Sequence, residues 1–291
     1  AVCALGAAKI SMNGGILQNN TSHRRGGAVY LENGAVFNMN GGTVKNNKTE
    51  PDTDSDSAYG GGAFYVRDAK LNIAGGSIVN NAATLYRGNG GGIYNSSYGT
   101  TRITGGYISG NTANLSGNGI YHSSKEDTTA VFEIGGGANV EDDIYLSSDN
   151  AYKYSKITSK LQSNIKFTVG DNSYDRVIAE GSNYTLTYAD MAKMQVTNSD
   201  MALSLENNQI RLTQTANNTY TLYFGYDANG GSGTPASKEL TMIEGADYPV
   251  ETVDFTVIPK RDGYTFLGWD TDKSAAVPKY TAANAPQTIT I

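Results

Sequence analysis

The chain has 291 residues with 35 glycines, a single cysteine and a formal charge of −6, and only 17% of its residues are charged. Dense glycine and asparagine favour short strands joined by tight turns and disfavour helices. The mild negative charge argues against a nucleic-acid partner. No apolar run approaches the roughly 20 residues that a membrane span needs. With one cysteine, the chain cannot form an internal disulfide.

The first 146 residues contain five related segments. They cover residues 1–17, 28–44, 63–79, 92–108 and 119–140, and each contains a double glycine. The double glycines end at Gly15, Gly42, Gly76, Gly106 and Gly137, so the period is 27 to 34 residues. A fixed period of this length is typical of architectures that stack one structural unit upon the next.

Apolar residues alternate within each copy with the period of two that marks a strand with one buried face. Aligned copies place Met12, Met39, Ile73, Ile103 and Ile134 in one inward column. Each unit offers three short strands and cannot bury its apolar face alone. The sequence therefore predicts an all-β chain that begins with a parallel β-helix of about five coils at 1–146. We expect the right-handed form, because right-handed crossovers dominate.

Two further columns repeat once per unit. Asparagines lie five residues after each double glycine, at Asn20, Asn47, Asn81 and Asn111, with Asp142 in the fifth copy. Such a column predicts a hydrogen-bonded ladder at a bend. An outward aromatic row follows the inward valine or isoleucine, at Tyr30, Tyr65, Tyr94 and Tyr121, with Cys3 in the first copy. Planar rings on a flat sheet suit stacking against a sugar or a protein.

Candidate ligand-binding charges are few. Glu32 and Arg67 share a column beside the tyrosines, where they form either a cross-rung ion pair or half of a sugar-binding groove. Asp52, Asp54 and Asp56 alternate in the longest loop. Their spacing suits Ca²⁺, but no downstream glutamate completes a known calcium loop, so a solvated acidic loop is the favoured interpretation. We predict no cofactor, with Ca²⁺ as the alternative.

The rest of the chain divides into two segments. Residues 147–215 alternate like strands, and we predict a β-rich capping or linking region. Residues 216–291 carry D-x-NGG at Asp227–Gly231, then R-x-GY-x-F-x-GW from Arg261 to Trp269. This pair of motifs resembles the Listeria–Bacteroides repeat, also called the internalin B-type repeat. The resemblance implies a small β-grasp-like module of secreted or wall-attached bacterial proteins, here lacking the family's last strand.

The columns show no pairs of carboxylates of the kind that a β-helix polysaccharide hydrolase needs. The repeat region also resembles the pectate-lyase-like β-helices of bacterial adhesins and polymorphic outer-membrane proteins. The predicted function is a non-catalytic, adhesin-like rod and stalk on the bacterial cell surface, with its export signal and anchor outside these residues. Its expected partner is a glycan or a host or partner protein. A β-helix polysaccharide lyase or glycoside hydrolase, and a pure structural spacer, are the alternatives.

Overall fold

The computed structural model describes residues 1–51, 59–123, 130–147, 154–170, 175–197, 201–214, 219–243, 250–284 and 287–290. The chain divides into two compact units, Ala1–Gln214 and Thr215–Ile291. Strands make up nearly all of the regular structure in these described residues, which also contain one short α-helix and one 3₁₀ turn. The prediction of an all-β chain is confirmed.

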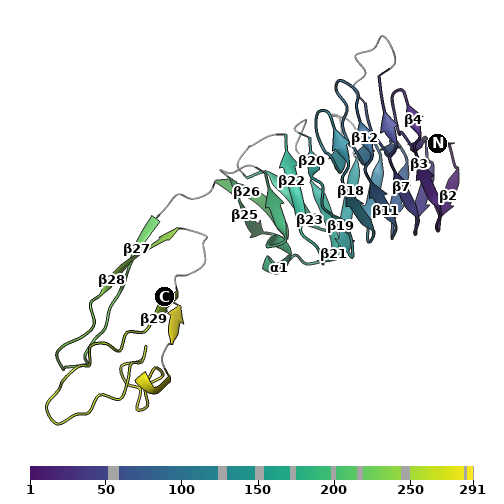
Figure 1. The fold of residues 1–291 in the computed structure, drawn as a ribbon. Coiled ribbons are helices and arrows are strands. Elements are labelled where there is room, and N and C mark those ends of the chain that lie inside the picture. The colour runs from purple at the N-terminus through teal and green to yellow at the C-terminus, as the bar shows by residue number, and fades with distance from the viewer. Residues whose placement is uncertain are drawn as a thin grey trace. The chain divides into compact units, whose positions relative to one another are not determined.

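The described residues of the first unit form four sheets, and in the first four turns the chain passes through all of them in succession (Figure 1). Sheet A contains, in spatial order, β1 (Val2–Leu5), β5 (Val29–Glu32), β9 (Phe64–Val66), β13 (Ile93–Asn95), β17 (Ile120–His122), β20 (Ile144–Leu146), β22 (Ile165–Val169) and β24 (Met194–Val196). Sheet B contains β2 (Lys9–Met12), β6 (Val36–Met39), β10 (Lys70–Ile73), β14 (Thr100–Ile103), β18 (Val131–Gly136), β21 (Ser155–Leu161), β23 (Val177–Gly181), β26 (Gln209–Gln214) and β25 (Met201–Glu206).

Two smaller sheets complete the first turns of the chain, sheet C through five turns and sheet D through four. Sheet C contains β3 (Ile16–Gln18), β7 (Thr43–Lys45), β11 (Ser77–Val79), β15 (Tyr107–Ser109) and β19 (Asn139–Val140). Sheet D contains β4 (Thr21–Ser22), β8 (Lys48–Thr49), β12 (Ala82–Ala83) and β16 (Thr112–Ala113). Every pair of neighbours in sheets C and D is parallel, because the chain returns to the same sheet in the same direction one turn later.

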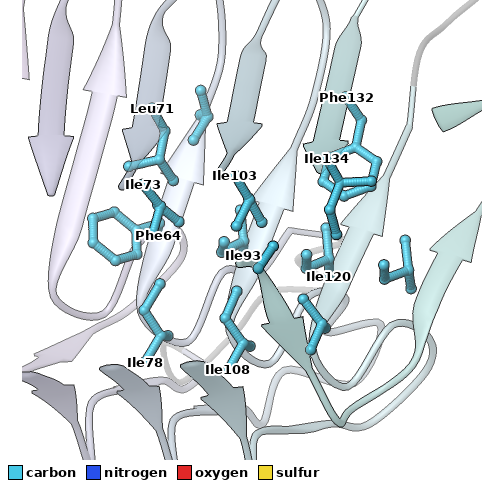
Figure 2. Close-up of a cluster of buried hydrophobic side chains, with 14 of the residues drawn as sticks. Phe64, Leu71, Ile73, Ile78, Ile93, Ile103, Ile108, Ile120, Phe132 and Ile134 are labelled. Carbon is cyan, nitrogen blue, oxygen red and sulfur yellow. The ribbon is translucent and has the colours of Figure 1, made fainter. Parts of the chain in front are cut away.

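Like residues lie above like residues from turn to turn. In sheet A, Val29 pairs with Phe64, Phe64 with Ile93, and Ile93 with Ile120. This register stacks the apolar columns into one continuous core between the sheets (Figure 2). An in-register stack buries the inward side chain of every internal turn, because a neighbour covers it on both sides.

The asparagine column forms an unbroken hydrogen-bonded ladder. The Nδ2 of Asn20 donates to Oδ1 of Asn47 at 2.8 Å, that of Asn47 to Asn81 at 2.9 Å, and that of Asn81 to Asn111 at 2.9 Å. Each accepting oxygen also receives the backbone N–H of the preceding asparagine, at 3.0 Å in all three steps. Asp142, which can only accept, receives Nδ2 of Asn111 at 2.8 Å and ends the ladder.

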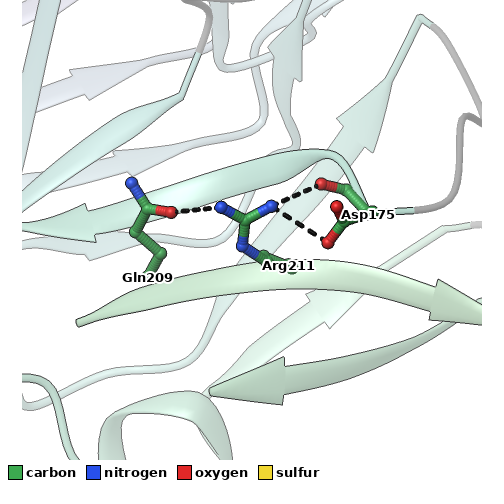
Figure 3. Close-up of polar contacts among 3 residues, drawn as sticks. All are labelled: Asp175, Gln209 and Arg211. Carbon is green, nitrogen blue, oxygen red and sulfur yellow. Dashed lines mark hydrogen bonds and ion pairs between the residues drawn. The ribbon is translucent and has the colours of Figure 1, made fainter. Parts of the chain in front are cut away.

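The parallel pairing continues beyond residue 146, where the sequence prediction placed the end of the β-helix. β22 and β24 extend sheet A beyond β20, and β21 and β23 extend sheet B beyond β18, all in parallel. An antiparallel hairpin of β25 and β26 then pairs with β23. The N–H groups of Arg211 on β26 donate to Asp175 and Gln209 (Figure 3), which fixes this hairpin to the turn before β23.

The short helix α1 (Tyr188–Met191) owes its position to a buried carboxylate. Asp190 is 1% exposed and accepts hydrogen bonds from the backbone of Leu161, from Thr187 and from the Tyr184 hydroxyl. Burial alone would raise the pKa of Asp190, but these hydrogen bonds outweigh it and hold the pKa below the ordinary value.

Asp190 gives the first unit a specific sensitivity to acid. A depressed carboxyl pKa contributes stability at pH values above the ordinary aspartate pKa, and this stability is lost as the pH falls through the folded-state pKa. We expect Asp190→Asn to cost about 1–3 kcal/mol near pH 7. The difference in the free energy of unfolding between the wild type and the variant should decrease below about pH 4. Urea unfolding at several pH values measures the free energy of unfolding of the wild type and of the variant. A difference that does not depend on pH would contradict the role of the Asp190 carboxylate.

One polar side chain interrupts an apolar column of sheet B. Thr101 lies between Leu71 and Phe132 in register, is fully buried, and its Oγ1 has no hydrogen-bond partner in the part of the chain that the structure describes. A buried hydroxyl without a partner costs about 1–3 kcal/mol. We therefore expect Thr101→Val to raise the free energy of unfolding by about 1 kcal/mol.

The control for that substitution is a threonine whose hydroxyl is bonded. Thr84 Oγ1 donates to the carbonyl oxygen of Thr49 at 2.8 Å, so Thr84→Val should lower stability. Chemical denaturation of both variants tests whether the free energy of unfolding rises with Thr101→Val and falls with Thr84→Val. Destabilisation by Thr101→Val would show that its hydroxyl has a partner, such as a bound water.

Where the structure describes the second unit, it contains two antiparallel strand pairs. β27 (Thr219–Phe224) pairs with β28 (Lys238–Ile243), and β29 (Val250–Thr252) with β30 (Thr288–Thr290), while η1 (Ala282–Asn284) precedes β30. Its buried apolar cluster consists of Val253, Trp269 and Tyr280. The indole N–H of Trp269 donates to the carbonyl oxygen of Asp254 at 3.0 Å. The core of this unit is therefore small and centred on one tryptophan.

Candidate functional site

The tyrosine row of sheet A is a continuous stack of rings. Tyr30, Tyr65, Tyr94, Tyr121 and Tyr145 occupy equivalent positions of β5, β9, β13, β17 and β20. Successive ring centroids are 5.6, 5.1, 5.0 and 5.2 Å apart, with interplanar angles of 17°, 20°, 30° and 7°. These separations follow from the strand spacing of roughly 4.8 Å, which places each ring over the next.

The stack is less accessible than an outward-facing row should be. Tyr65 is 1% and Tyr94 is 8% exposed, although neither belongs to the apolar cluster between the sheets. Arg25 lies over the rings of Tyr59 and Tyr65, at 4.0 and 5.2 Å from their centroids, and Tyr59 contacts Tyr65 edge-on. Tyr65 and Tyr94 therefore offer little exposed ring surface to a sugar, and the predicted binding row stays a prediction.

The structure joins Glu32 and Arg67, the two predicted charged residues, next to the first ring of the stack. Nη1 of Arg67 lies 3.4 Å from Oε1 of Glu32, and the Tyr30 hydroxyl donates to Oε2 of Glu32 at 2.6 Å. Burial raises the pKa of Tyr30, and the hydrogen bond to Glu32 raises it further. Because Arg67 is 46% exposed, its ion pair contributes at most about 1 kcal/mol.

Arg25 and Tyr59 lie in loops outside the aligned strands of the repeat. Each directly precedes a glycine, and the backbone N–H of Gly26 donates to the carbonyl oxygen of Gly60, so the two residues lie on adjacent turns. The signal in the sequence that could have pointed to Arg25 and Tyr59 is their position directly before consecutive glycines. Because the loops between repeats vary in length, an alignment of strands leaves this position unaligned.

The predicted calcium ligands Asp52, Asp54 and Asp56 lie outside the described residues. Within the described ranges, no three histidine, cysteine or acidic side chains gather as metal ligands would. Nor does any described helix have the length and apolar character needed to cross a membrane.

The loops between sheets D and A expose large side chains on a hydrogen-bonded backbone. Tyr86 is 77% and Leu115 is 60% exposed. The N–H of Leu115 donates to Gly88, and Nδ2 of Asn114 donates to the carbonyl oxygens of Thr84 and Leu85. These exposed side chains therefore lie on ordered loops of adjacent turns.

The second unit contains a cavity of about 1130 Å³ around its tryptophan. Tyr226 and Phe266 pack against Trp269 with ring centroids 4.7 and 4.9 Å apart. Tyr264 is 67% exposed at the cavity, with the Arg261 guanidinium 4.1 Å from its ring centroid. Trp269 and Phe266 thus serve the core, whereas Tyr264 does not.

Comparisons with protein-family models, with curated proteins and with solved structures return no match to this chain.

Proposed function

We propose that the first unit is a right-handed parallel β-helix and that the chain is a non-catalytic, adhesin-like segment of an extracellular bacterial surface protein. The observation that carries this proposal is the in-register stacking of turn upon turn in four sheets. A stack in which each turn contacts only its neighbours makes a stiff rod of adjustable length. The right hand follows the strong preference of parallel crossovers.

The positions of the acidic side chains support a non-catalytic role. Glu32 is engaged by Tyr30 and Arg67. Asp142 and Asp143 accept backbone N–H groups from the preceding turn, from Asn111 and Asn118 among others. Carboxylates committed to structural hydrogen bonds are poorly placed as the acid and base of glycoside hydrolysis.

The bacterial surface location and the stalk role of residues 215–291 rest on the paired glycine and aromatic motifs of that unit. Its loops are built from aspartates that cap their own backbone. Asp227 accepts the N–H of Asn229, and Asp272 accepts the N–H of Ser274. Such self-contained turns suit a small module that serves as a spacer between larger parts.

A glycan or protein ligand would bind the loops that carry Tyr86 and Leu115. Exposed tyrosines on an ordered backbone lose little conformational freedom on binding, which favours them in recognition surfaces. The tyrosine stack is the poorer candidate, because Tyr65 and Tyr94 are buried.

A glycan array probed with the purified chain tests the ligand assignment. Binding should be lost in Tyr86→Ser and retained in Tyr188→Ser, whose tyrosine is 70% exposed on α1 instead. Equal loss of binding in both variants would contradict a ligand site on these loops. If the wild type binds no glycan, the alternative of a purely structural spacer is favoured. Unsaturated products or new reducing ends from pectin, alginate or chondroitin, abolished by Glu32→Gln, would overturn the non-catalytic role.

A further inference from the structure

Six asparagines of this chain are followed directly by a glycine: Asn13, Asn33, Asn40, Asn89, Asn118 and Asn229. In such a pair the backbone nitrogen of the glycine can attack Cγ of the asparagine, so that ammonia leaves and a five-membered succinimide forms. Glycine permits this reaction because it has no side chain to hinder the attack and restricts the backbone least. Whether a given pair reacts in the folded chain depends on whether its two reacting groups are free to meet.

In the first unit, hydrogen bonds between turns hold one reacting group of every pair. Four of the glycine N–H groups donate to backbone carbonyl oxygens of another turn: Gly34 to Asp68, Gly41 to Met12, Gly90 to Ser116 and Gly119 to Asp143. Such an N–H must give up its hydrogen bond before its nitrogen can reach the side chain. In the fifth pair the side chain is held, because Oδ1 of Asn13 accepts Nδ2 of Asn40 at 2.8 Å.

Asn229 differs from these five, because neither of its reacting groups is firmly held. It is exposed and lies in a turn of the second unit. Among the residues that the structure describes, the N–H of Gly230 has no hydrogen-bond partner, and Nδ2 of Asn229 contacts only the carbonyl oxygen of Lys273, at 3.5 Å. We propose that Asn229 is a self-modification site, which water converts to isoaspartate with the help of Arg261. This proposal does not depend on the function proposed above.

The guanidinium of Arg261 acts on the peptide that reacts. Its Nη1 donates to the carbonyl oxygen of Asn229 at 2.7 Å, and its Cζ lies 4.1 Å from the centroid of the Tyr264 ring. A charged donor on a peptide oxygen withdraws electrons from that peptide, which makes the N–H of Gly230 more acidic. The carboxylate of Asp227 is already engaged, because its Oδ1 accepts the N–H of Asn229 at 2.8 Å. Hydroxide from the solvent therefore takes the proton of Gly230.

The reaction needs only hydroxide and water. The deprotonated nitrogen of Gly230 forms a bond to Cγ of Asn229, the bond from Cγ to Nδ2 breaks, and the leaving nitrogen takes a proton from water and departs as ammonia. Water then adds to the backbone carbonyl carbon of the succinimide, whose oxygen Arg261 holds, and the bond from that carbon to the nitrogen of Gly230 breaks. The former backbone carbonyl becomes a carboxylate beside Arg261, and the main chain now runs through the former side chain. Addition of water at Cγ would give aspartate instead.

Peptide mass spectrometry of the full-length chain, incubated in mildly alkaline buffer, tests the site. Electron-transfer fragmentation distinguishes isoaspartate from aspartate at each position. We expect Asn229 to convert several-fold faster than Asn33 and Asn118, which are also exposed but whose glycine N–H groups are held. In concentrated urea the three rates should become similar, because unfolding releases all the glycines. Equal rates in the folded chain, or no conversion of Asn229, would overturn the proposal.

Arg261→Gln tests the part that the guanidinium plays. We expect slower conversion of Asn229 and a smaller share of isoaspartate in the product, because the charged donor on the carbonyl oxygen is gone. Lys260→Gln, which removes the neighbouring positive charge, should leave the rate and the product ratio unchanged. A purely structural role of Arg261 predicts the opposite, since a looser turn would react faster with an unchanged product ratio. Faster conversion in Arg261→Gln would therefore contradict the role of Arg261 while leaving the site itself to the comparison with Asn33 and Asn118.

Discussion

Replacing Asn81 with alanine should destabilise the first unit by about 3–5 kcal/mol, because one side chain satisfies several buried groups. Asn81 is fully buried. Its Nδ2 donates to Val44, Val79 and Asn111, and its Oδ1 accepts both the backbone N–H and the Nδ2 of Asn47. Alanine would leave the Val44 and Val79 carbonyl oxygens and both Asn47 donors without this partner.

The same substitution at the exposed end of the ladder is the matched control. Asn20 is only partly buried, and Asn20→Ala should cost no more than about 1 kcal/mol, since water reaches the groups that it leaves unpaired. Equilibrium unfolding in urea gives both values. Similar costs at Asn81 and Asn20 would contradict a ladder whose strength depends on burial.

The regular part of the fold could be predicted because repetition fixes register. Alignment of copies placed Asn47 under Asn81, and the hydrogen bonds between them follow from that register. The same alignment could not predict burial, which depends on loops outside the repeat. Tyr65 is buried because Arg25 and Tyr59 approach it from those loops. Position within a strand determines which way a residue points, and the loops determine whether anything covers it.

The parallel pairing beyond residue 146 has no signal in the repeat alignment, for a related reason. The repeat was recognised by its glycine and asparagine corners, and these corners end near Asp142. In the fifth copy the positive φ lies at Gly136, within a register shift against β21. Beyond it, β22 still alternates buried and exposed residues from Ile165 to Val169. Strand pairing needs only this alternation. The stack therefore continues beyond the last turn that has the glycines and asparagine of the repeat.

Replacing Gly62 with alanine should destabilise the first unit about as much as Asn81→Ala. The cause here is a steric clash and not the loss of hydrogen bonds. A Cβ built on Gly62 would overlap the carbonyl oxygen of Gly91 and approach the backbone N and C of Ala82 at 2.5 and 2.6 Å. These atoms belong to backbone and cannot rotate away as a side chain can. Since adjacent turns meet here without room for a methyl group, we expect Gly62→Ala to cost more than about 3 kcal/mol.

Gly14 provides the control for Gly62, because it is also a turn glycine next to another glycine but has open space around it. A Cβ on Gly14 would meet nothing within 4 Å. Gly14→Ala should therefore change stability by no more than about 0.5 kcal/mol. The difference between the two denaturation midpoints isolates the close approach of the turns from the intrinsic effect of glycine on an unfolded chain. Equal midpoints would mean that the turns at Gly62 separate enough to admit a methyl group, which the hydrogen bond from its N–H to Gly90 at 3.0 Å opposes.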